Sequence, residues 1–246
     1  MRIAVARGVP AASPAAFPMT SSSPAAAHLT SPPAWEDAGA WPSPPASLPP
    51  EPWRQGLPTL RSHHVVVREL EDTDAASLLL MIGHPDVARF LGTPPSSVEG
   101  FEAFVRWTHR RRAEGAYACF GIVPADRTHA VGFVQVRALE ADFRTAEWGF
   151  ALGRPYWGSG LFAEAATRVI GFAFDVLGVQ RLQARSARDN HRCHAALRRL
   201  GARRLAVLRD AFETDGHYQD ELVWGLRAAD WPVPRQKGST WGGSCP

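Results

Sequence analysis

A glycine-rich corner at residues 153–161, "GRPYWGSGL", offers the clearest chemistry in the sequence. Gly158 and Gly160 stand directly before an apolar helical run, where glycine costs conformational entropy and adds no packing. The first N–H groups of a helix have no partner within it, and the helix dipole favours negative charge there. Glycines let such amides approach an anion, so this corner is typical of a phosphate cradle. A glycine-rich turn without a ligand is the alternative that these residues leave open.

The segment before the corner carries one carboxylate. Strand alternation along residues 145–152, "TAEWGFAL", places Glu147 on one face together with Gly149 and Ala151. A carboxylate on a face of small residues, beside the corner, could take a proton from an amine, directly or through water. The alternative is a carboxylate that neutralises a neighbouring arginine or faces solvent.

The segment "NHRCHAALRRLG" brings further candidates. Asn190 stands at the N-cap of the predicted helix, where asparagine is favoured for structural reasons. Cys193 follows one turn later, and its thiol could donate a proton to a leaving thiolate or simply fill a small buried space. His191 and His194 lack a second pair of ligands at suitable spacing, so we expect no metal site. A hydrolase with Cys193 as nucleophile and one of these histidines as its base is a further alternative.

The elements that position these residues lie in one stretch of the chain. Residues 1–58 are rich in alanine, serine and proline and predict a disordered or extended tail, and residues 231–246 predict a flexible C-terminal tail. Tryptophans in the first tail, of which Trp53 is the last, either remain in the linker or contact the domain. Residues 59–230 then form a single compact domain.

Strand and helix signals alternate through this domain and predict an α+β fold, with a mixed, mostly antiparallel sheet flanked by helices. The segment "RDAFETDG" is expected to be a loop between the last two strands. The expected strands cover residues 63–70, 117–123, 130–139, 145–152, 180–187, 203–209 and 218–226, and the expected helices cover 74–83, 96–115, 161–174 and 190–201.

Residues 60–231 resemble the GNAT acetyltransferase superfamily, in particular the RimJ/RimL-like branch that acetylates protein N-termini and assorted small amines. Five blocks in the family's order carry the resemblance: "VVVRELEDTDA", "HPDVARFLG", "AEWGFALGRPYWGSGLFAEAATRVIGFAFDVLGVQRLQA", "NHRCHAALRRLGA" and "DGHYQDELVWGL". Leu197 stands where the superfamily often has a tyrosine general acid, so that acid is absent at this place.

The resemblance implies an acetyl-CoA site around the glycine corner. It implies that the strand before the corner splays from its neighbour, so that amides near Gly149 and Phe150 polarise the thioester carbonyl, and that Asn190 touches the coenzyme. It further implies that backbone amides hold the pyrophosphate of acetyl-CoA, namely those of Trp157, Gly158, Ser159, Gly160 and Leu161.

Composition narrows the partners and the compartment. The 27 basic and 24 acidic residues are close to balance, so nucleic acid is not an expected partner. Three widely spaced cysteines favour a reducing cytoplasm, and no apolar run reaches the roughly 18 residues of a membrane span. The resemblance implies that the acceptor is an amine, either a protein N-terminus or a small molecule, and we expect a monomer or a homodimer. Candidates for lining the acceptor cleft are Arg106, Trp107, Tyr218 and Asp220, although Trp107 and Tyr218 could equally belong to the core.

The sequence therefore predicts an acetyl-CoA-dependent N-acetyltransferase without a metal. Direct attack of the amine in a ternary complex is expected, with Glu147 and Cys193 as the candidate catalytic residues. A coenzyme-binding or interaction module that has lost catalysis is the alternative.

Overall fold

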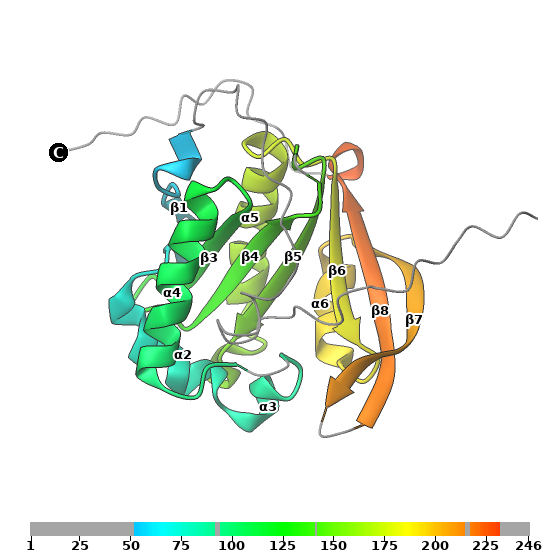
Figure 1. The fold of residues 1–246 in the computed structure, drawn as a ribbon, viewed down its shortest axis with the longest axis horizontal. Coiled ribbons are helices and arrows are strands. Elements are labelled where there is room, and N and C mark those ends of the chain that lie inside the picture. The colour runs from blue at the N-terminus through cyan, green and yellow to red at the C-terminus, as the bar shows by residue number, and fades with distance from the viewer. Residues whose placement is uncertain (1–51, 92–93, 141, 215–216, 232–246) are drawn as a thin grey trace, which may run out of the picture.

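A single sheet with helices on both faces forms the described part of the protein (Figure 1). The computed structural model describes residues 52–91, 94–140, 142–214 and 217–231. Neighbouring strands are antiparallel except for β5 and β6, which are parallel, and the spatial order is β1-β2-β3-β4-β5-β6-β8-β7. The predicted α+β class and the mostly antiparallel sheet are confirmed. The strands are β1 (Leu60–Arg61), β2 (Val65–Glu69), β3 (Tyr117–Pro124), β4 (Gly132–Ala138), β5 (Thr145–Leu152), β6 (Arg181–Ala187), β7 (Arg203–Thr214) and β8 (His217–Arg227).

The helices divide between the two faces of the sheet. Strand β3 shows this division, because Tyr117 and Cys119 pack toward α2 and α4 whereas Ala118 and Phe120 pack toward α5. Helix α6 buries Leu197 in the same core as α5. The helices are α2 (Ala75–Ile82), α3 (Pro85–Ala88), α4 (Val98–Ala113), α5 (Leu161–Asp175) and α6 (His191–Arg199), and short 3-10 turns lie at η1 (Pro52–Arg54), η2 (Asp72–Asp74), η3 (Arg154–Tyr156) and η4 (Ala228–Asp230).

The domain starts before the boundary that the sequence predicts. Composition places residues 52–58 in the tail, yet Trp53 is only 5% exposed and its ring meets that of Phe143 edge-on, with 5.8 Å between centroids. The amide of Leu57 also donates to the carboxylate of Glu69 at 3.3 Å. Burial of one large aromatic side chain explains why this proline-rich stretch joins the core. The rest of the predicted N-terminal tail lies outside the described residues.

The C-terminal end differs from the prediction in two places. Strand β7 extends to Thr214, and residues 212–214 pair with β8 instead of belonging to a loop. Trp231 packs against Phe174, with 6.0 Å between ring centroids, and so joins the domain. Residues 232–246 of the predicted C-terminal tail lie outside the described residues.

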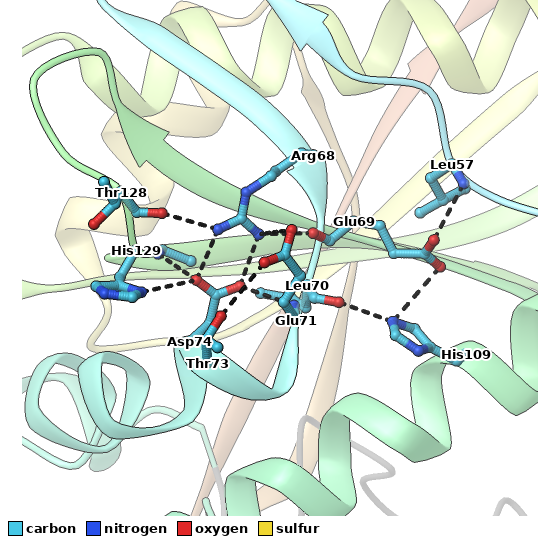
Figure 2. Close-up of polar contacts among 11 residues, drawn as sticks. Leu57, Arg68, Glu69, Leu70, Glu71, Thr73, Asp74, His109, Thr128 and His129 are labelled. Carbon is cyan, nitrogen blue, oxygen red and sulfur yellow. Dashed lines mark hydrogen bonds and ion pairs between the residues drawn. The ribbon is translucent and has the colours of Figure 1, made fainter. Parts of the chain in front are cut away.

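A buried ion pair ties β2 to the start of α2 and to the turn before β4 (Figure 2). Arg68 donates two hydrogen bonds to the carboxylate of Asp74, at 2.8 and 2.9 Å. Asp74 is fully buried and also accepts from the backbone amides of Glu71 and Ala130. Burial alone would raise the pKa of Asp74, but the hydrogen bonds from Arg68, Ala130 and Glu71 bring it below its usual value.

Candidate functional site

The parallel pair β5–β6 separates half-way along its length. The two strands pair only from Thr145 to Glu147 on β5, opposite Arg181–Gln183 on β6, whereas β5 pairs with β4 along its whole length. Figure 1 shows β5 and β6 diverging beyond this point. The structure therefore contains the splay that the resemblance implied, and it leaves one edge of each strand open.

The register identifies which backbone groups face this opening. Hydrogen bonds from Leu139 N to Thr145 O and from Gly153 N to Val131 O mark hydrogen-bonded positions between β4 and β5. Such positions alternate along an antiparallel pair, so the backbone groups of Gly149 point to β4. Those of Phe150 point toward β6 and into the opening. Of the two amides expected to polarise a carbonyl, only that of Phe150 is free to do so.

The glycine corner has the backbone conformation that its residues suggest. Gly158 and Gly160 have φ values of +80° and +87°, in the left-handed region that other residues rarely adopt. A Cβ placed on either glycine would meet no atom within 4 Å. Conformation and not crowding therefore requires glycine here, and the space beside both amides is open.

Four amides at this corner are available to a ligand. Within the described part of the chain, no acceptor is found for the amides of Gly158, Gly160, Phe162 and Ala163. The sequence-based prediction did not include Phe162 and Ala163, although the rule that the first turn of a helix leaves its amides unpaired points to them. The other predicted amides already have acceptors: Trp157 N donates to Arg154 O at 3.1 Å, Ser159 N to Tyr156 O at 3.4 Å and Leu161 N to Ser159 Oγ at 3.3 Å.

A cavity of about 790 Å³ lies at the open end of β5, between α3 and the first turns of α5 and α6. This volume is within the range of small-molecule sites. Six of the ten predicted site residues line it: Phe150, Trp157, Gly158, Gly160, Asn190 and Cys193. The other four, Glu147, Gly149, Ser159 and Leu161, are not among the lining residues.

Glu147 lies where the pairing of β5 and β6 ends, at the apex of the opening. Its carboxylate forms ion pairs with Arg137 at 3.1 Å and with Arg185 at 3.5 Å, and its side chain is 12% exposed. The structure thus contains the arginine contacts that were the alternative to a catalytic role. These contacts fix the orientation of the carboxylate, and the role of Glu147 as a base stays a prediction.

Asn190 caps α6, since its Oδ1 accepts from the amide of Cys193 at 3.1 Å. Burial raises the pKa of the Cys193 thiol to about 11, so the thiol is protonated at neutral pH. His194 is buried with its Nε2 at 3.1 Å from Ala187 O, and burial lowers its pKa. In the described part of the chain, no hydrogen bond joins Cys193 to a histidine. The described residues therefore give the hydrolase alternative neither a lowered thiol pKa nor a histidine hydrogen-bonded to Cys193.

Residues 64–203 match the acetyltransferase (GNAT) domain family. The chain belongs to the GNAT family. It is 24% identical over 171 residues to the uncharacterised N-acetyltransferase YoaA of Bacillus subtilis (strain 168). This alignment covers 69% of this chain and 97% of YoaA. It is 24% identical over 137 residues to the [ribosomal protein uS5]-alanine N-acetyltransferase of Escherichia coli (strain K12), covering 55% of this chain and 71% of that enzyme.

Solved GNAT structures share the fold. The structure of Mycobacterium smegmatis RimJ in complex with CoA-disulfide superposes with a TM-score of 0.63 at 19% identity, covering 70% of this chain and 85% of that one. At this identity the superposition shows the shared fold, and the curated relatives support the RimJ-like branch of the family. This GNAT chain is therefore an N-acetyltransferase.

The residues that were expected to shape the acceptor side of this GNAT domain lie in different places. Trp107 is buried against Tyr117 and belongs to the core. Arg106 lies on α4, 3.5 Å from Asp72. Tyr218 is exposed on β8, whereas Asp220 on the same strand is almost buried. The four side chains thus do not form one cleft.

Among the described residues, no group of three or more histidine, cysteine or acidic side chains is placed to hold a metal ion. Within the same residues, none of the helices combines the length and the apolarity that crossing a membrane requires.

Proposed function

We propose that the chain transfers the acetyl group of acetyl-CoA to a primary amine, either a protein N-terminus or a small-molecule amine, by direct attack in a ternary complex. The observation that carries the proposal is the cavity at the splayed β5–β6 edge, whose wall at α5 presents four amides without an acceptor among the described residues. Backbone N–H groups at a helix N-terminus suit the two negative phosphates of a coenzyme.

The chain's own groups fit that coenzyme. The amides of Gly158, Gly160, Phe162 and Ala163 would hold its pyrophosphate, since no side chain covers the two glycines. The open edge of β5 would pair with the amides of the pantetheine arm as an added strand would. When bound, acetyl-CoA supplies the activated acetyl thioester.

Three groups would then act on the reaction. Glu147 would take the proton from the acceptor ammonium, directly or through water, because it lies at the apex of the opening. The amide of Phe150 would donate to the oxyanion that develops on the acetyl carbonyl. Asn190 would contribute its side-chain amide to the coenzyme site, since it lines the cavity while its oxygen caps α6.

Cys193 is better suited to packing than to proton donation. A thiol with a pKa of about 11 is a weaker acid than an ordinary thiol of pKa about 8.5. Burial therefore makes proton transfer from it to a thiolate less favourable than from an ordinary thiol.

A screen of amine acceptors tests this proposal. The purified protein is incubated with acetyl-CoA and N-terminal peptides, polyamines, aminoglycosides or amino acids, and release of free thiol is followed. Calorimetry with CoA reports binding separately. Release that depends on an amine is expected. If CoA binds and no amine accelerates thiol release, the result supports the alternative interpretation, a coenzyme-binding module that has lost catalysis.

A further inference from the structure

Two exposed arginines converge on one carboxylate beside the cavity. Arg188 follows β6, Arg209 lies on β7 and Asp220 lies on β8. The Nη1 atoms of the two arginines are 3.1 and 2.8 Å from the same oxygen of Asp220. Asp220 is almost buried, whereas the side chains of Arg188 and Arg209 are 64% and 78% exposed. One negative charge therefore faces two positive charges, which leaves the triad with a net charge of +1.

Most hydrogen-bond donors of the two guanidinium groups remain available. Each group carries five N–H donors and uses one of them on Asp220. For Arg188 and Arg209, no other acceptor is found among the residues that the structure describes. Planar guanidinium groups bind carboxylate and phosphate through paired hydrogen bonds. An anion placed between them would displace water and not a protein partner.

The backbone around Arg209 is shaped to hold this arrangement. The pairing of β7 with β8 is irregular between Leu208 and Phe212, and Asp210 has a φ of +47°. A bulge of this kind redirects the side chains beside it. The amide of Asp210 lies 3.4 Å from the second oxygen of Asp220, which fixes the bulge against β8. Left-handed backbone at a residue other than glycine is uncommon and often occurs at functional sites.

The triad lies at the end of the sheet that holds the cavity. Arg188 directly precedes Asp189 and Asn190, both of which line the cavity. Helix α3 lines it from the other side, and Figure 1 shows the β7–β8 hairpin at the same end of the sheet as α3. A chain that extends from the cavity along this end would come within reach of the two guanidinium groups.

We propose that Arg188 and Arg209 bind an anionic group of the acceptor, namely the carboxylate of an acidic residue close to the N-terminus of a peptide. This inference rests on the proposed function and narrows its acceptor class to peptides with aspartate or glutamate near the amine that is acetylated. A phosphate of the coenzyme has the same chemistry, so the test must separate the two sources.

Matched peptides provide the test. Heptapeptides with N-terminal alanine carry a single glutamate at position 2, 3, 4 or 5, and each is compared with its glutamine counterpart at saturating acetyl-CoA. For at least one position, we expect a KM about tenfold lower for the glutamate peptide, which is the effect of about 1.4 kcal/mol from a charge-assisted contact. Arg188→Gln and Arg209→Gln should each remove most of this difference and leave kcat unchanged. Arg204→Gln, at an exposed arginine of the same strand, is the control and should preserve it.

Three outcomes overturn the inference. Equal KM values for every glutamate and glutamine pair would do so. A rise in the KM of acetyl-CoA in the two variants, without a rise for 3′-dephospho-acetyl-CoA, would assign the arginines to the coenzyme phosphate. If no peptide is acetylated, the proposed function fails for peptides. Calorimetry of the same peptide pairs, with CoA present, then measures whether the protein binds the glutamate peptide more tightly than the glutamine peptide. Equal affinities would overturn the inference. Thermal unfolding of each variant checks that it folds.

Discussion

At the scale of single residues, Glu147 is the candidate base, and its surroundings bear on both interpretations that the sequence left open. Its carboxylate contacts Arg137 and Arg185, and it also lies at the apex of the β5–β6 opening. Its position on a strand before the glycine corner could be predicted from alternation alone. The contact with Arg185 could not, because β6 reaches Glu147 only after the chain has passed through α5.

We expect Glu147→Gln to lower kcat by about 10²- to 10³-fold, the usual contribution of a general base, and to leave the KM of acetyl-CoA nearly unchanged. The substitution keeps the shape of the side chain and removes the proton acceptor. Steady-state kinetics with the best amine of the screen measures the effect. Glu140→Gln, at an exposed carboxylate before β5, is the control and should leave kcat unchanged. Full activity of Glu147→Gln would leave Glu147 with only its structural contacts to arginine.

For Cys193, we expect both Cys193→Ser and Cys193→Ala to retain activity within about threefold. The reason is the raised pKa of its thiol, about 11, which makes the group a poor acid toward a thiolate. Rates of thiol release for the two variants provide the measurement. A loss of more than tenfold in Cys193→Ala that Cys193→Ser partly restores would show that a proton donor is needed at this position.

At the scale of elements, the N-terminus of α5 is where we propose that the chain holds a diphosphate. The turn could be predicted because glycine directly before an apolar helix is costly unless its backbone conformation is needed, and the Asn190 cap because asparagine is favoured there. The same rules did not reveal that Trp157, Ser159 and Leu161 already donate within the chain, since turn hydrogen bonds depend on the path of η3. They also did not predict that β7 extends to Thr214.

We expect Gly160→Ala to weaken CoA binding by about tenfold. A Cβ would find open space there, so the cost comes from the left-handed backbone, at about 1 to 2 kcal/mol, which shifts the turn away from the geometry that presents its amides. Calorimetry with CoA measures the affinity. The matched control is Gly171→Ala within α5, where a Cβ also meets open space, the backbone is helical, and alanine should stabilise the helix by about 1 kcal/mol. Unchanged CoA affinity in Gly160→Ala would mean that this turn does not hold the coenzyme.

At the scale of the whole molecule, the sheet has to keep β5 and β6 apart at one end while its other strands stay paired. Contacts that few sequence signals reveal support it, such as the long-range packing of Trp53 against Phe143 and the ion pair of Arg68 with Asp74. Trp53 lies in a proline-rich stretch whose composition predicted a tail. Its burial could not be predicted, because its aromatic partner Phe143 comes from the turn before β5, far away in the sequence.

The Arg68–Asp74 pair should contribute strongly to the stability of the domain. We expect Asp74→Asn to lower the free energy of unfolding by about 3 kcal/mol at pH 7, because the guanidinium of Arg68 loses its closest counter-charge and keeps only the exposed carboxylate of Glu71 at 3.7 Å. Urea unfolding followed by circular dichroism measures the change. Asp126→Asn, at an exposed pair with Arg127, is the control and should change stability by less than about 0.5 kcal/mol.

The effect of Asp74→Asn should also depend on pH in one direction. The pKa of Asp74 is lowered in the folded state, so its contribution is complete above the unfolded value of about 3.9 and is lost as pH falls through the folded pKa. The stability difference between the wild-type protein and Asp74→Asn should therefore be constant from pH 7 to about 5 and shrink at more acidic pH. A difference that stays the same down to pH 2 would show that the ionised carboxylate is not what stabilises this part of the fold.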